Sequence, residues 1–103
     1  NVFSKETTKT IKEDLINAIA DENGTGHSIY HDSVTLAGKT GTAEIKQSQS
    51  DTTGTELGWF TVMTTDSKQP LLITTLVEDV KDRGGSGYVV EHTKTPLDLY
   101  LSK

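Results

Sequence analysis

The chain has 103 residues, 24% of them charged and 32% hydrophobic, which is typical of one folded domain or of part of one. Its formal net charge of -5, from 15 acidic and 10 basic residues, offers no basic surface to neutralise phosphates, so no nucleic acid partner is expected. Because the chain has no cysteine, disulfide scaffolds, thiolate metal sites and thiol catalysis are excluded as well.

Residues 4–21 are predicted to form an amphipathic helix. Its apolar residues recur at steps of three and four, at Ile11, Leu15, Ala18 and Ile19. Ser4 is a suitable N-cap. The D-E-N-G sequence at 21–24 is a natural stop, since asparagine or glycine takes the left-handed conformation that closes a helix. A polar loop is expected to follow as far as residue 33.

Three consecutive strands are predicted next. The first enters at residue 34 and carries G-K-T-G-T at 38–42, the second covers 57–63, and the third covers 70–80. Residues 47–55 contain no apolar side chain and are expected to form an exposed hairpin loop, and residues 66–69 a turn. Such short connections favour an antiparallel meander.

A final helix is predicted for residues 88–101, after a loop at 81–87 that contains three glycines. Pro96 either begins a short last turn or kinks a longer helix, because proline lacks an amide donor. The whole order predicts an α+β fold, in which a three-stranded antiparallel meander is flanked by N- and C-terminal helices packed on a face.

The most informative stretch is Lys39-Thr40-Gly41, in a predicted strand between small residues. Strict alternation sends Lys39 to one face and Thr40 to the other, so a ligand could use both only by lying along the strand edge. There Lys39 would supply positive charge, while the hydroxyls of Thr40 and Thr42 hold a carboxylate. Gly41 would let a ligand backbone come close, and the Thr42 amide could face a developing oxyanion. These features indicate recognition of an anionic peptide end.

The same stretch has two alternative interpretations. One is an ordinary polar edge strand without a function. The other is a nucleotide-binding P-loop, which also ends in Gly-Lys-Thr. That motif requires glycine where Ser33 stands, and a helix where residues 41–43 continue a strand. The spacing therefore disfavours nucleotide binding.

Residues elsewhere are assigned structural roles. The spacing of His27 and His31 would suit a metal only on a helix, so both are expected to be solvated, and neither a metal nor a cofactor is predicted. Trp59 and Phe60 point to opposite faces of a strand, so at least one belongs to the core. A solvated charged corner is expected from Glu78, Asp79 and Asp82.

Residues 11–44, with N-G-T-G at 23–26 and A-G-K-T-G-T-A-E at 37–44, resemble the third active-site motif of penicillin-binding proteins. G-W-F at 58–60, V-E-D-V at 77–80 and R-G-G-S at 83–86 are similar to the end of class B transpeptidase domains, above all the low-affinity Gram-positive group. The resemblance implies that residues 1–103 are the C-terminal portion of such a domain. It also implies that Lys39 lends charge to the serine of the second motif. Thr40 and Thr42 would grip the carboxylate of a cell-wall peptide or β-lactam, Gly41 would admit it, and the Thr42 amide would form half of the oxyanion hole.

The nucleophile of that family is missing. Neither Ser-x-x-Lys nor Ser-x-Asn occurs in residues 1–103, and T-D-S-K at 65–68 has the wrong nucleophile. The isolated chain is therefore expected to be inactive, although the resemblance implies a parent serine D,D-transpeptidase that cross-links peptidoglycan and binds penicillin. A serine β-lactamase of the same fold and a non-catalytic binding module remain alternatives.

The expected partners are peptidoglycan stem peptides, β-lactams and the remainder of the parent domain. No apolar run is long enough to cross a bilayer, and no signal peptide is recognisable. The resemblance implies a parent at the extracellular face of the bacterial cytoplasmic membrane, with its anchor outside this chain. Without the rest of that domain, the chain is expected to self-associate or to co-purify with its parent. Loss of cover is expected at Val34, Leu36, Trp59, Val62, Leu72 and Ile73.

Overall fold

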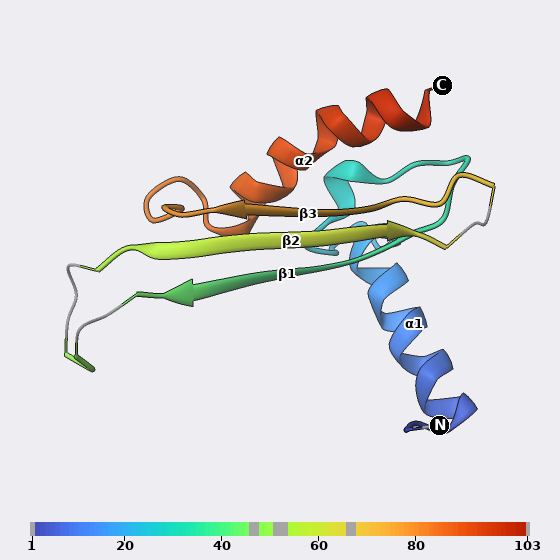
Figure 1. Ribbon diagram of the computed structural model, residues 1–103, viewed down its shortest axis with the longest axis horizontal. Coiled ribbons are helices and arrows are strands. Elements are labelled where there is room, and N and C mark those ends of the chain that lie inside the picture. The colour runs from blue at the N-terminus through green and yellow to red at the C-terminus, as the bar shows by residue number, and fades with distance from the viewer. Residues whose placement is uncertain (1, 46–47, 51–53, 66–67, 103) are drawn as a thin grey trace.

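The computed structural model describes residues 2–45, 48–50, 54–65 and 68–102. Within them the elements follow in the order α1 (Lys5–Ala20), the 3-10 helix η1 (His27–Ile29), β1 (Leu36–Glu44), β2 (Glu56–Thr64), β3 (Leu72–Val77) and α2 (Ser86–Leu101). The strands form one sheet, α2 lies over the sheet, and α1 runs away from it beyond β1 (Figure 1). The predicted α+β fold is confirmed. The predicted loop at 47–55 and turn at 66–69 lie partly outside the described residues.

The sheet is an antiparallel meander with strand order β1-β2-β3, as predicted. β3 is shorter than the predicted range of 70–80. Pro70 has no amide to contribute to a ladder, and the Leu71 amide donates instead to the Thr64 hydroxyl at 3.0 Å. At the other end, the Asp79 carboxylate accepts from the Lys81 amide at 3.2 Å, which turns the chain out of the sheet.

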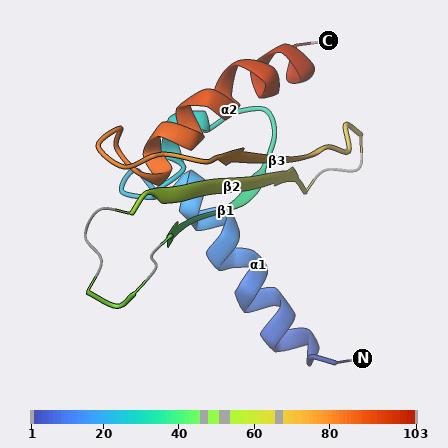
Figure 2. The same ribbon diagram turned by 60° about the vertical axis from the view of Figure 1, so that its left-hand side comes forward.

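Only the carboxyl-terminal half of α1 packs against the rest of the molecule. The helix begins as predicted, because the Ser4 hydroxyl accepts from the Thr7 amide at 3.1 Å. It ends at Ala20 with extended backbone at Asp21, and not with the predicted left-handed residue. Residues 5–14 are exposed throughout, whereas Ile19 is fully buried. The helix thus projects past the edge of β1 and does not lie along a face of the sheet (Figure 2).

α2 covers one face of the sheet. It starts at Ser86, two residues before the predicted start, after Gly85 with a φ of 63° that suits glycine. Pro96 is exposed inside the continuous helix, so it does not begin a separate last turn. The Thr93 hydroxyl lies 2.9 Å from the Val89 carbonyl, which can only accept, and 2.7 Å from the Thr75 hydroxyl; the contact with Thr75 joins α2 to β3.

The two faces of the sheet differ in their cover. The inner face, which packs on α2, carries Gly38, Thr40, Phe60, Val62, Ile73 and Thr75. The outer face carries Lys39, Gly41, Trp59, Met63, Leu72 and Leu76. The core forms between the inner face, α2, η1 and the end of α1, from Ile19, Ile29, Leu36, Phe60, Val62, Val80, Val89, Val90 and Leu97. Phe60 is therefore the core aromatic of the predicted pair.

The predicted loss of cover is wrong for part of the sheet. Leu36 and Val62 are buried, because η1, α2 and the end of α1 already cover the inner face. Val34 and Ile73 are partly buried against the same core. Leu72 is 65% exposed, as the prediction required. Exposed apolar surface on the sheet thus gathers on the outer face.

Candidate functional site

The Lys39–Thr42 stretch lies in the middle of β1, at an edge of the sheet. Its two neighbouring side chains separate as alternation predicts: Lys39 is exposed on the outer face, and Thr40 is buried on the inner face. Thr42 follows Thr40 on the same side and is exposed, since it lies nearer the end of the strand. The motif therefore presents different side chains to the two sides of one edge.

The main chain of Thr40 and Thr42 points away from the sheet. In an antiparallel pair, alternate residues exchange both hydrogen bonds with the partner strand, and those between them face outward. The Ile45 amide donates to the Thr55 carbonyl at 2.9 Å, and the Thr65 amide donates to the Thr35 carbonyl at 3.0 Å. Because these bonds continue the ladder at both ends, the odd-numbered residues of β1 are the ones bonded to β2. The even-numbered residues thus direct their amides and carbonyls to the open edge.

Lys39 places a cation beside this edge. Its Nζ donates to the Thr40 carbonyl at 2.8 Å, which agrees with an outward-facing carbonyl. No carboxylate of the described residues forms an ion pair with Lys39. The ammonium charge is therefore not neutralised within this part of the chain, and an anion on the edge would meet it directly.

The Thr40 hydroxyl has a partner on the inner face. Thr40 is 9% exposed, and its Oγ1 lies 3.5 Å from Oγ1 of Thr25, in the loop before η1. Both hydroxyls are on the side of the strand opposite the Lys39 side chain. A contact between the Thr40 hydroxyl and a ligand carboxylate stays a prediction.

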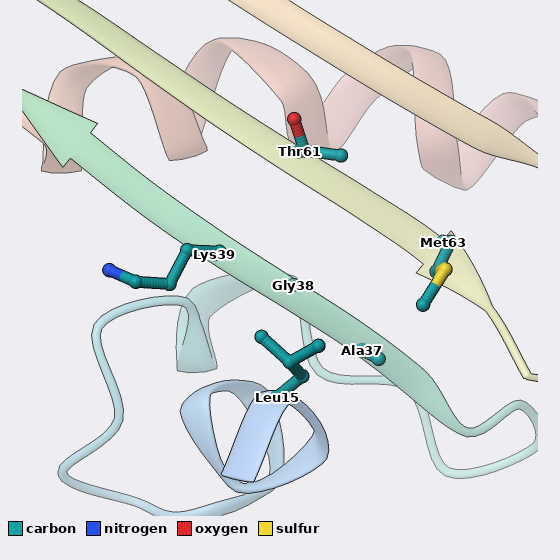
Figure 3. A pocket seen from close by; sticks show the side chains of 6 residues that line it. All are labelled: Leu15, Ala37, Gly38, Lys39, Thr61 and Met63. Carbon is teal, nitrogen blue, oxygen red and sulfur yellow. The ribbon is translucent and has the colours of Figure 1, made fainter. Parts of the chain in front are cut away.

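A small pocket lies on the outer face beside Lys39. It has a volume of about 80 Å3 and lies between α1 and the first two strands (Figure 3). Its lining residues are Leu15, Ala37, Gly38, Lys39, Thr61 and Met63. Pockets for drug-sized ligands usually enclose several hundred Å3. This pocket can accept one side chain, but it cannot enclose a peptide.

Sequence reasoning missed two contacts of the motif. It gave Thr25 no role, although its hydroxyl lies beside that of Thr40. It gave Trp59 no contact with the motif, although this residue pairs with Gly41 and its ring covers the glycine. Both contacts depend on which residues become neighbours in space. A glycine opposite an aromatic residue is the signal that could have indicated the second one, but only with the register known.

The sequence suggested that His27 and His31 are solvated, but each of them has a partner within the protein. Nδ1 of His27 is 2.8 Å from the Ile19 carbonyl oxygen, and Nε2 of His31 is 2.8 Å from the Asp98 carboxylate. They join η1 and its flanking loop to α1 and α2. In the part of the chain that the structure describes, no three His, Asp or Glu side chains gather in an arrangement for a metal ion.

The predicted charged corner after β3 is a structural joint. The Asp79 carboxylate accepts from the Thr55 hydroxyl at 2.6 Å, and this hydrogen bond lowers the pKa of Asp79. The Lys81 ammonium donates to the Gly54 carbonyl at 3.0 Å. These bonds join the end of β3 to the start of β2, away from Lys39.

Comparison with known proteins identifies the family. Residues 1–96 match the family model for the penicillin binding protein transpeptidase domain. Over 93 residues the chain is 43% identical to penicillin-binding protein 3 of Bacillus subtilis (strain 168), a match that covers 90% of this chain and 14% of that protein. No helix among the described residues is long and apolar enough to span a membrane. This chain therefore belongs to the penicillin-binding protein transpeptidase family.

Proposed function

We propose that this chain supplies the substrate-binding strand of a serine D,D-transpeptidase that cross-links peptidoglycan and is acylated by penicillin. The observation that carries the proposal is the phase of the β1 ladder, which directs the main chain of Thr40 and Thr42 to an open edge. An extended stem peptide can pair with such an edge through main-chain hydrogen bonds. A β-lactam would occupy the same edge in its place.

Each residue of the motif takes a separate role in this proposal. Lys39, which forms no ion pair with a carboxylate of the described residues, brings its charge to the reacting serine region of the parent. The hydroxyls of Thr40 and Thr42 hold the ligand carboxylate, and Gly41 leaves room for the ligand backbone. The outward-facing Thr42 amide forms half of the oxyanion hole.

The nucleophile comes from another part of a longer protein, because Ser-x-x-Lys does not occur in residues 1–103. The exposed outer-face residues Met63, Leu72 and Leu76 support a docking role for this face, since a soluble monomer rarely leaves such a surface uncovered. The remainder of the transpeptidase domain is the proposed partner there. The whole enzyme is proposed to act at the extracellular face of the cytoplasmic membrane, and the isolated chain to self-associate and to be inactive.

The proposal is tested by incubating the longer protein and the isolated chain with a fluorescent penicillin. We expect a stable acyl adduct of one antibiotic on the longer protein, and no label on the isolated chain. An adduct on the isolated chain, detected by mass spectrometry, would show a nucleophile within residues 1–103 and overturn the assignment. Rapid hydrolysis of the adduct would indicate a β-lactamase and not a transpeptidase.

A further inference from the structure

Trp59 lies across Gly41 on the outer face of the sheet. The two residues are direct partners in the register of β1 and β2. A Cβ built on Gly41 would overlap Cε2, Cζ2 and Nε1 of the indole. The backbone of Gly41 is outside the left-handed region, so its conformation would accept any residue. The indole ring is therefore what excludes a side chain at this position.

A glycine within a strand weakens the ladder, because it loses more conformational entropy than other residues and has no side chain to pack. An aromatic side chain on the neighbouring strand offsets this weakness when it covers the glycine. Trp59 gives such cover at the centre of the motif, between the two residues whose main chain faces the open edge.

We propose that Trp59 is a positioning residue for the open edge of β1. Its ring holds the main chain at Gly41 and thereby keeps the Thr40 carbonyl and the Thr42 amide in the directions that a ligand needs. The inference rests on the proposed function for the identity of that ligand. It gives a second reason why residue 41 is glycine. Besides admitting the substrate, Gly41 leaves space for the indole ring.

The first test is hydrogen exchange of the full-length protein, measured by mass spectrometry on the peptide that covers residues 38–44. The amides of Lys39, Gly41 and Ala43 are the ones bonded to β2. We expect Trp59→Ala to raise their exchange about fivefold and Trp59→Phe to stay near the wild-type rate. Met63→Ala is the matched control, because it shortens another outer-face side chain of the same strand. It should leave residues 38–44 unchanged.

The peptide that covers α2 separates local from global effects. If exchange in α2 rises as much as exchange in residues 38–44, Trp59 acts on stability in general and the inference is wrong. Unchanged exchange at residues 38–44 in Trp59→Ala would overturn it equally.

The second test is a double-mutant cycle on acylation by a fluorescent penicillin. Gly41→Ala forces the strand and the ring apart, and a displacement of about 1 Å can slow a positioned reaction about 100-fold. We expect this loss to be much smaller when Trp59→Ala has removed the ring, so the double variant should react faster than Gly41→Ala alone. The loss should also affect the acylation rate more than the noncovalent affinity. Multiplicative effects of the two substitutions would contradict the inference.

The two tests distinguish this inference from the proposed function. If the wild-type protein forms no acyl adduct, the proposed function fails, and hydrogen exchange still decides whether Trp59 holds the strand. If the wild-type protein is acylated, but Trp59→Ala does not change hydrogen exchange and the two substitutions show no coupling, only the role of Trp59 is refuted.

Discussion

The two faces of the sheet are formed by the same three strands but differ in how far their apolar side chains are buried. On the inner face, Phe60 and Val62 are each 1% exposed beneath α2 and the end of α1. On the outer face, Met63, Leu72 and Leu76 are 39%, 65% and 58% exposed. Burial of apolar surface is the main source of stability, so within this chain stability comes from the inner face. These three apolar side chains of the outer face contribute little within this chain.

The motif spans both environments, because consecutive residues of a strand alternate between faces. Lys39 lies on the open side and Thr40 on the covered side. Neighbouring substitutions should therefore separate binding from stability, and each prediction below tests that separation in the longer protein unless the isolated chain is named.

The largest effect on stability is expected from Phe60→Ala. It removes the largest fully buried side chain and leaves a cavity, which typically costs about 3–5 kcal/mol in the free energy of unfolding. Leu76→Ala is the matched control, since its side chain is 58% exposed. Its expected cost is below about 1 kcal/mol. Urea denaturation of both variants of the isolated chain provides the comparison, and similar losses would mean that self-association covers the outer face as tightly as α2 covers the inner one.

Lys39→Ala is expected to slow acylation by penicillin about 100- to 1000-fold, since it removes the charge that Lys39 is proposed to bring to the reacting centre. Its side chain is exposed, so the free energy of unfolding should change by less than about 0.5 kcal/mol. The acylation rate and the urea midpoint are measured on the same preparation. Lys94→Ala, an exposed lysine of α2, is the control. A parallel loss of stability and acylation would make Lys39 structural.

Thr40→Val is expected to slow acylation about fivefold, because it removes the proposed hydroxyl contact with the ligand, worth about 1 kcal/mol, and keeps the shape of the side chain. Thr93→Val makes the same change in α2, where it packs on the inner face of the sheet, away from the open edge of β1. It should cost about 1 kcal/mol in unfolding free energy, because the Thr75 hydroxyl loses its partner, and should leave acylation unchanged. An equal effect of both substitutions on acylation would remove Thr40 from the ligand site.

Self-association of the isolated chain should depend on the outer face. We expect Leu72→Gln combined with Leu76→Gln to lower the apparent mass measured by light scattering at several concentrations, because it removes exposed apolar surface. Leu99→Gln on α2 is the control, at 64% exposure. A wild-type chain that is monomeric at every concentration would show that the outer face needs no cover.

The smallest effect concerns the joint at Asp79. The pKa of the Asp79 carboxyl is lower in the folded chain than in the unfolded chain. Its contribution to stability is therefore present above the unfolded-state pKa and is lost as pH falls through the folded-state pKa. Thr55→Val removes the donor that is the main cause of this shift, so the pKa should rise toward the ordinary value. Carboxyl titration by NMR measures it, and an unchanged pKa would assign the shift to Lys81 and Arg83.

The order of elements, the start and length of α1 and the antiparallel meander followed from the sequence alone, and the role of Lys39-Thr40-Gly41 in ligand binding stays a prediction from it. They depend on local periodicity and on the chemistry of single residues, such as the capping hydroxyl of Ser4. Alternation was also enough to separate Lys39 from Thr40, because the period of a strand is a local property.

Only the tertiary structure decided which face is covered, which main-chain groups of β1 face the open edge, and that Trp59 lies over Gly41. It also revealed that α1 projects past the sheet and that His31 bonds to Asp98, 67 residues away in sequence. These features depend on strand register and on long-range packing. A shift of one residue in the pairing would reverse every face of a strand, and the pairing depends on contacts between strands as well as on the pattern along each one.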